Sequence, residues 1–140
     1  MLARRVSSLV GLVAIAYVVF LFLPWAKGAD ETSIGSRAGV DMVPGFLSLA
    51  SGVVLVLWEV LGAAGVRRAG RSDSLVSFFL AGSTAILGIL GVIHAKWGDS
   101  SPFAVDLAYG AFVALALAIL LLLGASAHLA LHVLGDRRQA

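Results

Sequence analysis

Residues 105–134 read VDLAYGAFVALALAILLLLGASAHLALHVL, and Asp106 is the only charged residue among them. An α-helix rises 1.5 Å per residue, so about 20 apolar residues cross the roughly 30 Å hydrocarbon core of a bilayer. Three further apolar runs occupy residues 6–23, 43–65 and 75–95. We therefore expect an all-α membrane protein with four transmembrane helices.

The composition of the whole chain agrees with this interpretation. Hydrophobic residues make up 60% of the 140 residues and charged residues 13%, against about 25% charged in an ordinary soluble domain. The mean hydropathy is +1.01, and the connections are too short to hold a separate domain. We expect one transmembrane domain over residues 1–140. Its expected parts are spans at about 6–24, 43–65, 75–95 and 105–134, outer loops at 25–42 and 96–104, and an inner loop at 66–74.

Most of the arginines lie on one side of the four runs. They precede the first run, separate the second from the third and follow the fourth: Arg4, Arg5, Arg67, Arg68, Arg71, Arg137 and Arg138. The other side carries only Lys27, Arg37 and Lys96, beside several carboxylates. Because Lys and Arg in short loops favour the cytoplasm, both termini are expected inside. The net charge of +2 then indicates contact with the lipid bilayer rather than with nucleic acid.

The first run has an alternative interpretation as a signal peptide. Arg4 and Arg5 resemble a signal-peptide n-region, and Ala26-Lys27-Gly28 is an acceptable cleavage site. However, the apolar stretch 6–23 exceeds the usual 7–15 residues of the apolar region of a signal peptide. We therefore expect the run to be retained as a span.

Two stretches of the chain resemble each other and suggest an internal duplication. Residues 40–45 and 105–110 both read Val-Asp-apolar-x-x-Gly, and each precedes an apolar run. The preceding runs both end close to a Trp and a Gly. This pattern predicts two tandem helical hairpins related as a parallel repeat, in which Gly45 and Gly110 let a neighbouring helix approach. The alternative is a chance similarity between two membrane-exit loops.

Local roles are expected for the other residues of these stretches. Trp25 and Trp97 are expected at the outer interface, where aromatic rings form a belt. Asp41 and Asp106 stand before the second and fourth runs, where an acidic side chain caps free backbone amides.

Small residues at four-residue spacing occur in every run and predict close helix packing. They include Ser7-x-x-x-Gly11, Ser48-x-x-x-Gly52, Ser77 with Ala81 and Ala85, Thr84-x-x-x-Gly88, and Gly110 with Ala114 and Ala118. We expect a helix bundle, in which such seams also offer a surface for an oligomer.

Three ionisable residues inside the runs form the candidate functional group. Glu59 lies about 9–12 Å from the inner end of the second run, where an unpaired carboxylate is costly. His128 and His132 share one face of the fourth helix, and His128 is expected to hydrogen-bond Glu59. The favoured interpretation is a buried pair that fixes helix register. The alternatives are a proton-titrating Glu59 and a metal site of all three residues, since two histidines at this spacing are a known ligand pattern.

A second polar group is expected at the outer face. It comprises His94, Asp99, Asp106 and Asp41, beside Lys96. An imidazole among carboxylates is able to respond to external pH. The favoured interpretation is nevertheless an exposed loop histidine with charged neighbours.

The chain lacks the usual signatures of soluble enzymes, such as a phosphate-binding loop or a nucleophile elbow. With no cysteine, thiolate chemistry is excluded.

Leu23-Pro24-Trp25 and Gly39-Val40-Asp41 resemble the Pro-Trp exit and Gly-x-Asp re-entry of bacterial SPW-repeat membrane proteins and of small actinobacterial four-helix membrane proteins. Leu23 stands where the SPW family has Ser. The resemblance implies a four-helix architecture in a bacterial plasma membrane and no defined activity.

We therefore expect a non-enzymatic structural or accessory membrane protein without a cofactor, which associates with itself or with another membrane protein. The first alternative is a small oligomeric proton-coupled transporter or channel in which Glu59 titrates. The second is a membrane metalloprotein that uses His128 and His132.

Overall fold

The computed structural model describes residues 2–28, 37–41, 43–66, 71–97 and 105–137. Four helices dominate it: α1 (Leu2–Phe20), α2 (Val43–Ala63), α3 (Arg71–Trp97) and α4 (Tyr109–Arg137). By length and composition, α2, α3 and α4 are long and apolar enough to cross a membrane, whereas the apolar part of α1, Arg5–Phe20, is shorter. The prediction of a helical protein with four helices is confirmed, and three of these helices have the length and composition that a membrane span requires.

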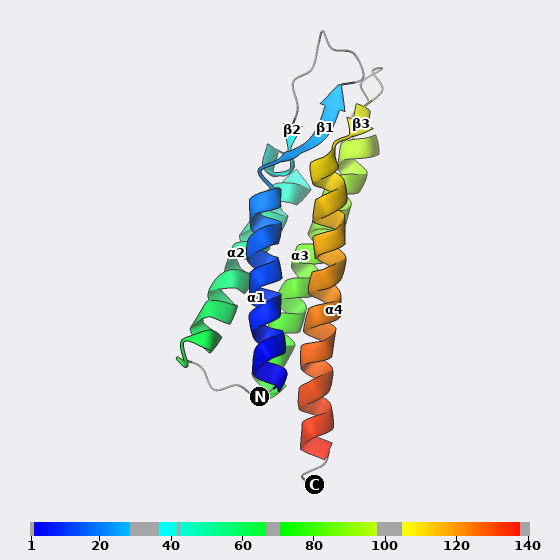
Figure 1. Cartoon of the computed structure of the whole chain (residues 1–140). Coiled ribbons are helices and arrows are strands. Elements are labelled where there is room, and N and C mark those ends of the chain that lie inside the picture. The colour runs from blue at the N-terminus through cyan, green and yellow to red at the C-terminus, as the bar shows by residue number, and fades with distance from the viewer. Residues whose placement is uncertain (1, 29–36, 42, 67–70, 98–104, 138–140) are drawn as a thin grey trace.

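The four helices form an elongated bundle in which successive helices run in opposite directions (Figure 1). Helix α1 packs against α2 and α4, and α3 packs against the same two helices, so α1 and α3 lie on a diagonal. Both ends of the chain lie at one end of the bundle, and the strands lie at the other. This arrangement brings residues from four helices to each level of the core.

The ends of α1 and α2 follow from local backbone chemistry. Helix α1 stops at Phe20 and the chain turns before Pro24, which has no amide to donate to a helix. Helix α2 begins with Val43 and Pro44, because proline is tolerated in the first turn. At its other end Gly65 has φ +74°, and the amides of Gly65 and Val66 donate back to Gly62 and Leu61. These bonds form a Schellman motif, which a left-handed glycine allows.

A small sheet covers the strand end of the bundle. It has the order β2-β1-β3, where β1 is Pro24–Gly28, β2 is Arg37–Ala38 and β3 is Val105–Leu107, and both pairings are antiparallel. A 3-10 turn, η1 (Gly39–Asp41), links β2 to α2. Residues 25–28 and 37–41 belong to the expected outer loop at 25–42, and within that loop they form strands and a 3-10 turn. Their backbone groups pair with one another and with β3, which precedes α4.

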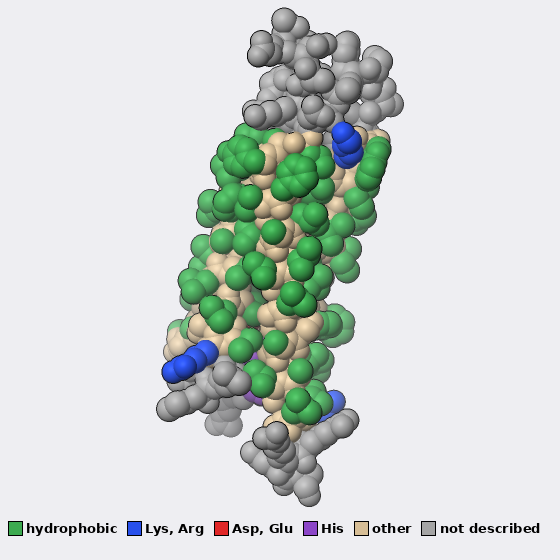
Figure 2. All heavy atoms as spheres, turned by 45° about the vertical axis from the view of Figure 1, so that its right-hand side comes forward, with side chains coloured by type: hydrophobic (Ala, Val, Ile, Leu, Met, Phe, Trp, Pro, Cys, Tyr) green, Lys and Arg blue, Asp and Glu red, His purple; other side chains and the backbone are tan. Residues whose placement is uncertain are grey.

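Small side chains fill the interior of the bundle and large apolar side chains cover its surface, which is the opposite of the distribution in a soluble bundle. The buried interior holds mostly small residues: Ala14, Ala81, Ala85, Ala111, Ala114, Ala118, Ala125, Ser48, Ser77 and Thr84. Large apolar side chains such as Leu12, Phe79 and Leu123 are exposed. Figure 2 shows this apolar surface along the length of the bundle, with Lys and Arg at its two ends.

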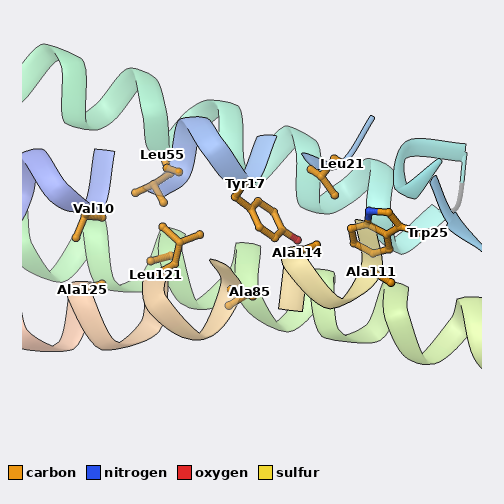
Figure 3. Packing of buried hydrophobic residues seen from close by; sticks show 13 residues of the cluster. Val10, Tyr17, Leu21, Trp25, Leu55, Ala85, Ala111, Ala114, Leu121 and Ala125 are labelled. Atoms are coloured by element: carbon orange, nitrogen blue, oxygen red, sulfur yellow. The ribbon is translucent and has the colours of Figure 1, made fainter. Parts of the chain in front are cut away.

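The interior also contains a few large side chains, and Trp25 closes the strand end (Figure 3). Trp25 is fully buried, and its Nε1 donates to the Phe20 carbonyl at 3.1 Å. A Cβ built on Gly39 would lie 2.5 Å from its ring, so the glycine makes room for the indole. Trp25 was expected as a ring of an interfacial belt, whereas β1 folds it over the core, where it is fully buried. Trp97 is 74% exposed.

Gly45 and Gly110, the glycines of the two repeated stretches, make room for the segments that cover the strand end of the bundle. A Cβ on Gly45 would lie 1.9 Å from the Gly39 carbonyl oxygen, and one on Gly110 would lie 2.4 Å from the Pro24 carbonyl oxygen. Both glycines therefore admit the backbone of the connecting segments, whereas the sequence had indicated a neighbouring helix.

Candidate functional site

Glu59 is a buried carboxylate near the end of the bundle that lies opposite the strands. It lies on α2, four residues before the helix ends, and only 4% of its surface is exposed. The Ser7 hydroxyl of α1 donates to its Oε2 at 2.5 Å, and the Ser77 hydroxyl of α3 donates to its Oε1 at 2.6 Å. Each carboxylate oxygen thus accepts a bond from a different helix. Glu59 ties three helices together at this level.

The small-residue seams bring the two serines to Glu59. One turn beyond Ser7, a Cβ on Gly11 would lie 3.3 Å from the Glu59 Cβ, so this glycine leaves room for the stem of the acid. Ser77 is 1% exposed and lies between the buried Ser74 and Ala81 on α3. The sequence identified both serines only as packing residues. They also act as hydrogen-bond donors, because the carboxylate of Glu59 is buried and must be bonded by protein groups.

His128 lies near this cluster but does not make the expected hydrogen bond. The serine hydroxyls satisfy Glu59 instead, and the buried Nδ1 of His128 has no hydrogen-bond partner among the described residues. His128 is 3% exposed and interacts electrostatically with Glu59 and with His132. The rings of His128 and His132 meet edge to face, with their centroids 5.1 Å apart. His132 is half-buried.

The metal hypothesis finds no three-ligand group in the parts of the chain that the structure describes. Glu59, His128 and His132 are not gathered there into a set that would hold an ion, and no other His, Asp or Glu residues are gathered in this way. The arrangement at Glu59 is a hydrogen-bonded carboxylate with two histidines to one side.

The expected outer-face group is only partly described. His94 is exposed near the end of α3. The Asp41 carboxylate accepts a bond from the Ala38 amide at 2.9 Å, so it closes the turn between β2 and α2. Residue 42, between Asp41 and α2, lies outside the described residues, so the capping of α2 by Asp41 stays a prediction. The backbone of Asp106 pairs with that of Lys27. The side chain of Asp106, and all of Asp99, lie outside the described residues.

A second buried polar cluster lies at the middle of the bundle, and the sequence did not reveal it. The Tyr17 hydroxyl of α1 lies 2.7 Å from the Ser48 hydroxyl of α2, which donates to the Thr84 carbonyl of α3 at 2.8 Å. The hydroxyls of Thr84 and Ser51 are 2.9 Å apart. Tyr17 is fully buried. Its place in an otherwise apolar run was the available signal, since a buried Tyr needs a hydrogen-bond partner.

An apolar layer separates the two polar clusters. On α2, Leu55 is the buried residue between Gly52 and Glu59. On the facing helices, Val10 and Leu121 occupy the corresponding level, and their side chains converge with Leu55 in Figure 3. All three are at most 2% exposed. These buried apolar side chains therefore separate the Glu59 cluster from the polar cluster at the middle of the bundle.

Comparison with known proteins adds no further identification: no protein-family model, curated protein or solved structure matches this chain.

Proposed function

We propose that the chain is a four-span structural or accessory protein of a bacterial plasma membrane, which associates with itself or with another membrane protein. The distribution of side-chain size supports a membrane location most directly. Alanine and serine fill the interior, while leucine, valine and phenylalanine cover the outside. Water would penalise that surface, whereas lipid accepts it and small residues let the helix backbones approach.

The proposal includes α1 as the fourth span, although its apolar helix is the shortest. Helix α1 lies between α2 and α4 and presents Leu9, Ile15 and Val19 outward. These side chains therefore share the surroundings of the helices beside them. The chain also stays apolar beyond the helix, through Phe22 and Leu23.

Two features support an orientation with both termini in the cytoplasm. The described ends of α1 and α4 lie at the same end of the bundle (Figure 1). The sequence places Arg4, Arg5, Arg137 and Arg138 close to these ends, and arginine-rich flanks remain inside. Two tandem hairpins are the connectivity that we infer from this orientation.

An accessory role is supported by how the interior is filled. The small residues that the sequence offered for oligomer contacts, such as Ser48, Ala85 and Ala114, are buried within the single chain. A partner would therefore contact the exposed large side chains, such as Phe46 and Phe79. Glu59 already has two hydroxyl donors, which suits a residue that holds helices in register.

Reporter fusions and native co-purification test this proposal together. Fusions to each terminus should both report the cytoplasm, and gentle detergent extraction should recover a defined partner or a homo-oligomer, identified by mass spectrometry. Glu59→Gln should retain that association, because an amide still bonds to both serine hydroxyls. Termini on opposite faces, or a monomer without a partner in native membranes, would contradict the proposal.

A second candidate is the proton-coupled transporter or channel in which Glu59 titrates. The observation that favours it is a buried carboxylate that interacts electrostatically with the buried His128, whose Nδ1 has no hydrogen-bond partner among the described residues. Membrane-embedded acids of this kind commonly serve transport. In that case Glu59→Gln should abolish flux in proteoliposomes while the protein still folds and assembles.

A further inference from the structure

Two buried ionisable residues, Glu59 and His128, and the half-buried His132 form a series that leads from the interior of the bundle toward the end of α4. His132 is half-buried, His128 is 3% exposed and Glu59 is 4% exposed. His132 lies four residues nearer than His128 to the end of α4, which is about 6 Å along the helix. We propose that Glu59 is a proton-binding site reached from the cytoplasmic end through His132 and His128. This inference rests on the membrane location proposed above.

One ring contact and one electrostatic interaction link the members of this series. The rings of His132 and His128 are 5.1 Å apart between centroids, and His128 interacts electrostatically with Glu59. An imidazole accepts a proton on one ring nitrogen and releases one from the other. The Nδ1 of His128, with no hydrogen-bond partner in the described segments, is free for such an exchange. In the net step one proton leaves cytoplasmic water and the Glu59 carboxylate becomes a neutral carboxyl.

The serine pair accommodates Glu59 in both protonation states. As a carboxylate, Glu59 accepts from Ser7 and Ser77, one bond to each oxygen. As a neutral acid, it donates its own proton to one serine oxygen and still accepts from the other, because a hydroxyl is both donor and acceptor. Protonation therefore needs only a hydroxyl rotation. Both states keep the same neighbours.

The site is closed on the side away from the cytoplasm. Val10, Leu55 and Leu121 fill the next level of the core and carry no group that relays a proton. In this conformation Glu59 exchanges protons with one side of the membrane only. Such one-sided access separates a proton-binding site from a leak.

Other charged groups on the neighbouring helices lie near this end of the bundle. Arg5 on α1 and Arg71 on α3 are exposed, and Asp73 on α3 is half-buried one turn before Ser77. On α4 the described titratable side chains at this end of the bundle are His128 and His132, whereas the side chains of Asp136 and Arg137 lie outside the described residues. Asp73 supplies a matched control, because it is a second carboxyl near this end of the bundle and lies on a different helix from Glu59.

Time-resolved infrared spectroscopy tests the proposal on the purified full-length protein in lipid nanodiscs. A flash releases protons from a photolabile caged acid in the buffer, and the carbonyl stretch of a newly protonated carboxyl is followed. The wild-type band should appear after the flash. It should be lost in Glu59→Gln and retained in Asp73→Asn.

The histidines are tested by the rate at which this band rises. His132→Gln should slow the rise by about a hundredfold, which is the scale of a lost proton-transfer group. His94→Gln removes a histidine at the other end of the bundle and should leave the rate unchanged. His128→Gln should act like His132→Gln. Since His132 is half-buried, its variant keeps the test valid if His128→Gln fails to fold.

Two results would overturn the inference. One is a Glu59 band that does not respond to released protons, and the other is a rise rate unaffected by His132→Gln. Nanodiscs expose both faces, so neither result depends on which face is cytoplasmic. A wrong topology would instead appear in the terminal reporters, which separates failure of the proposed function from failure of the proton path.

Discussion

The bundle holds two buried polar clusters that differ in kind. The central cluster consists of Tyr17, Ser48, Ser51 and Thr84, and every member is a hydroxyl. The Ser48 and Thr84 hydroxyls donate to backbone carbonyls at 2.8 Å, and Tyr17 reaches Ser48 at 2.7 Å. Such a network is neutral and its donors have acceptors. It stabilises the packing of three helices against one another and contains no carboxylate or imidazole that would exchange a proton.

The Glu59 cluster, by contrast, contains an ionisable group. Ser7 and Ser77 bond to Glu59, and the buried imidazole of His128 lies within its electrostatic reach. Burial and polarity are similar in the two clusters, so neither property distinguishes a structural cluster from a functional one. The difference lies in whether a member can change its charge and whether a route to water exists.

The largest effect on the central cluster is expected from Gly88→Ala. A Cβ at this position would lie 2.0 Å from the Tyr17 hydroxyl oxygen and 3.0 Å from the ring carbon that carries it. The rigid ring must move, and Ser48 then loses its partner. We expect a loss of about 3 kcal/mol in the free energy of unfolding, at the upper end for overpacking, measured by SDS titration in mixed micelles.

Gly82→Ala on the same helix is the matched control. Its Cβ would meet no described atom within 4 Å, so the same change of residue should be neutral or slightly stabilising. Adding Tyr17→Phe to Gly88→Ala removes the oxygen in closest contact and should recover part of the loss. Equal effects of the two glycine substitutions would show that Tyr17 does not occupy this position.

The separation of the clusters is tested by Leu55→Ala. Leu55 is fully buried between them and faces Val10 and Leu121 (Figure 3). Its truncation should cost about 2 kcal/mol through the cavity alone, since lipid gives little hydrophobic penalty to the unfolded state. The measurement is the same unfolding titration. Leu57→Ala, at a 58% exposed position of α2, is the control and should have little effect.

The sequence predicted the helices and the burial of Glu59, because both follow from local composition. Long apolar runs specify helices in lipid, and Glu59 is a lone acid inside one of them. It did not predict the partner of Glu59. His128 was the obvious choice by chemical type, but Ser7 and Ser77 lie 52 and 18 residues away in the chain and meet Glu59 only once the helices pack.

The burial of Trp25 at the strand end of the bundle could not be predicted from the sequence for the same reason. Trp25 after an apolar run is typical of an interfacial ring, and local sequence offers no other indication. Its burial depends on β1 pairing with β3 and on room at Gly39 and Gly91, which come from three distant segments. Gly91, whose Cβ would lie 3.0 Å from the indole, carries no local signal of this role. Non-local pairing of this kind is not encoded by periodicity.

Within the Glu59 cluster, Ser77→Ala should cost more than Ser7→Ala. Ser77 is 1% exposed whereas Ser7 is half-buried, so water is better placed to replace the lost Ser7 bond. We expect about 1.5 kcal/mol for Ser77→Ala, as for a hydrogen bond to a charged group, and roughly half of that for Ser7→Ala. Unfolding titrations of both variants in the Glu59→Gln background should shrink the difference. An unchanged difference there would mean that the serines act through packing alone.

The smallest effect is expected from Tyr17→Phe in the central cluster. The Ser48 hydroxyl donates to the Thr84 carbonyl, so Tyr17 is the donor to Ser48. Its removal leaves one acceptor lone pair unused but no unsatisfied donor. The ring still fills the space beside Gly88, and the expected cost is about 0.6 kcal/mol, the average for hydrogen bonds between membrane helices. A loss of unfolding free energy as large as that of Ser77→Ala would show that a hydrogen bond in the neutral cluster stabilises the protein as much as one to Glu59. The two clusters would then not differ in the way described above.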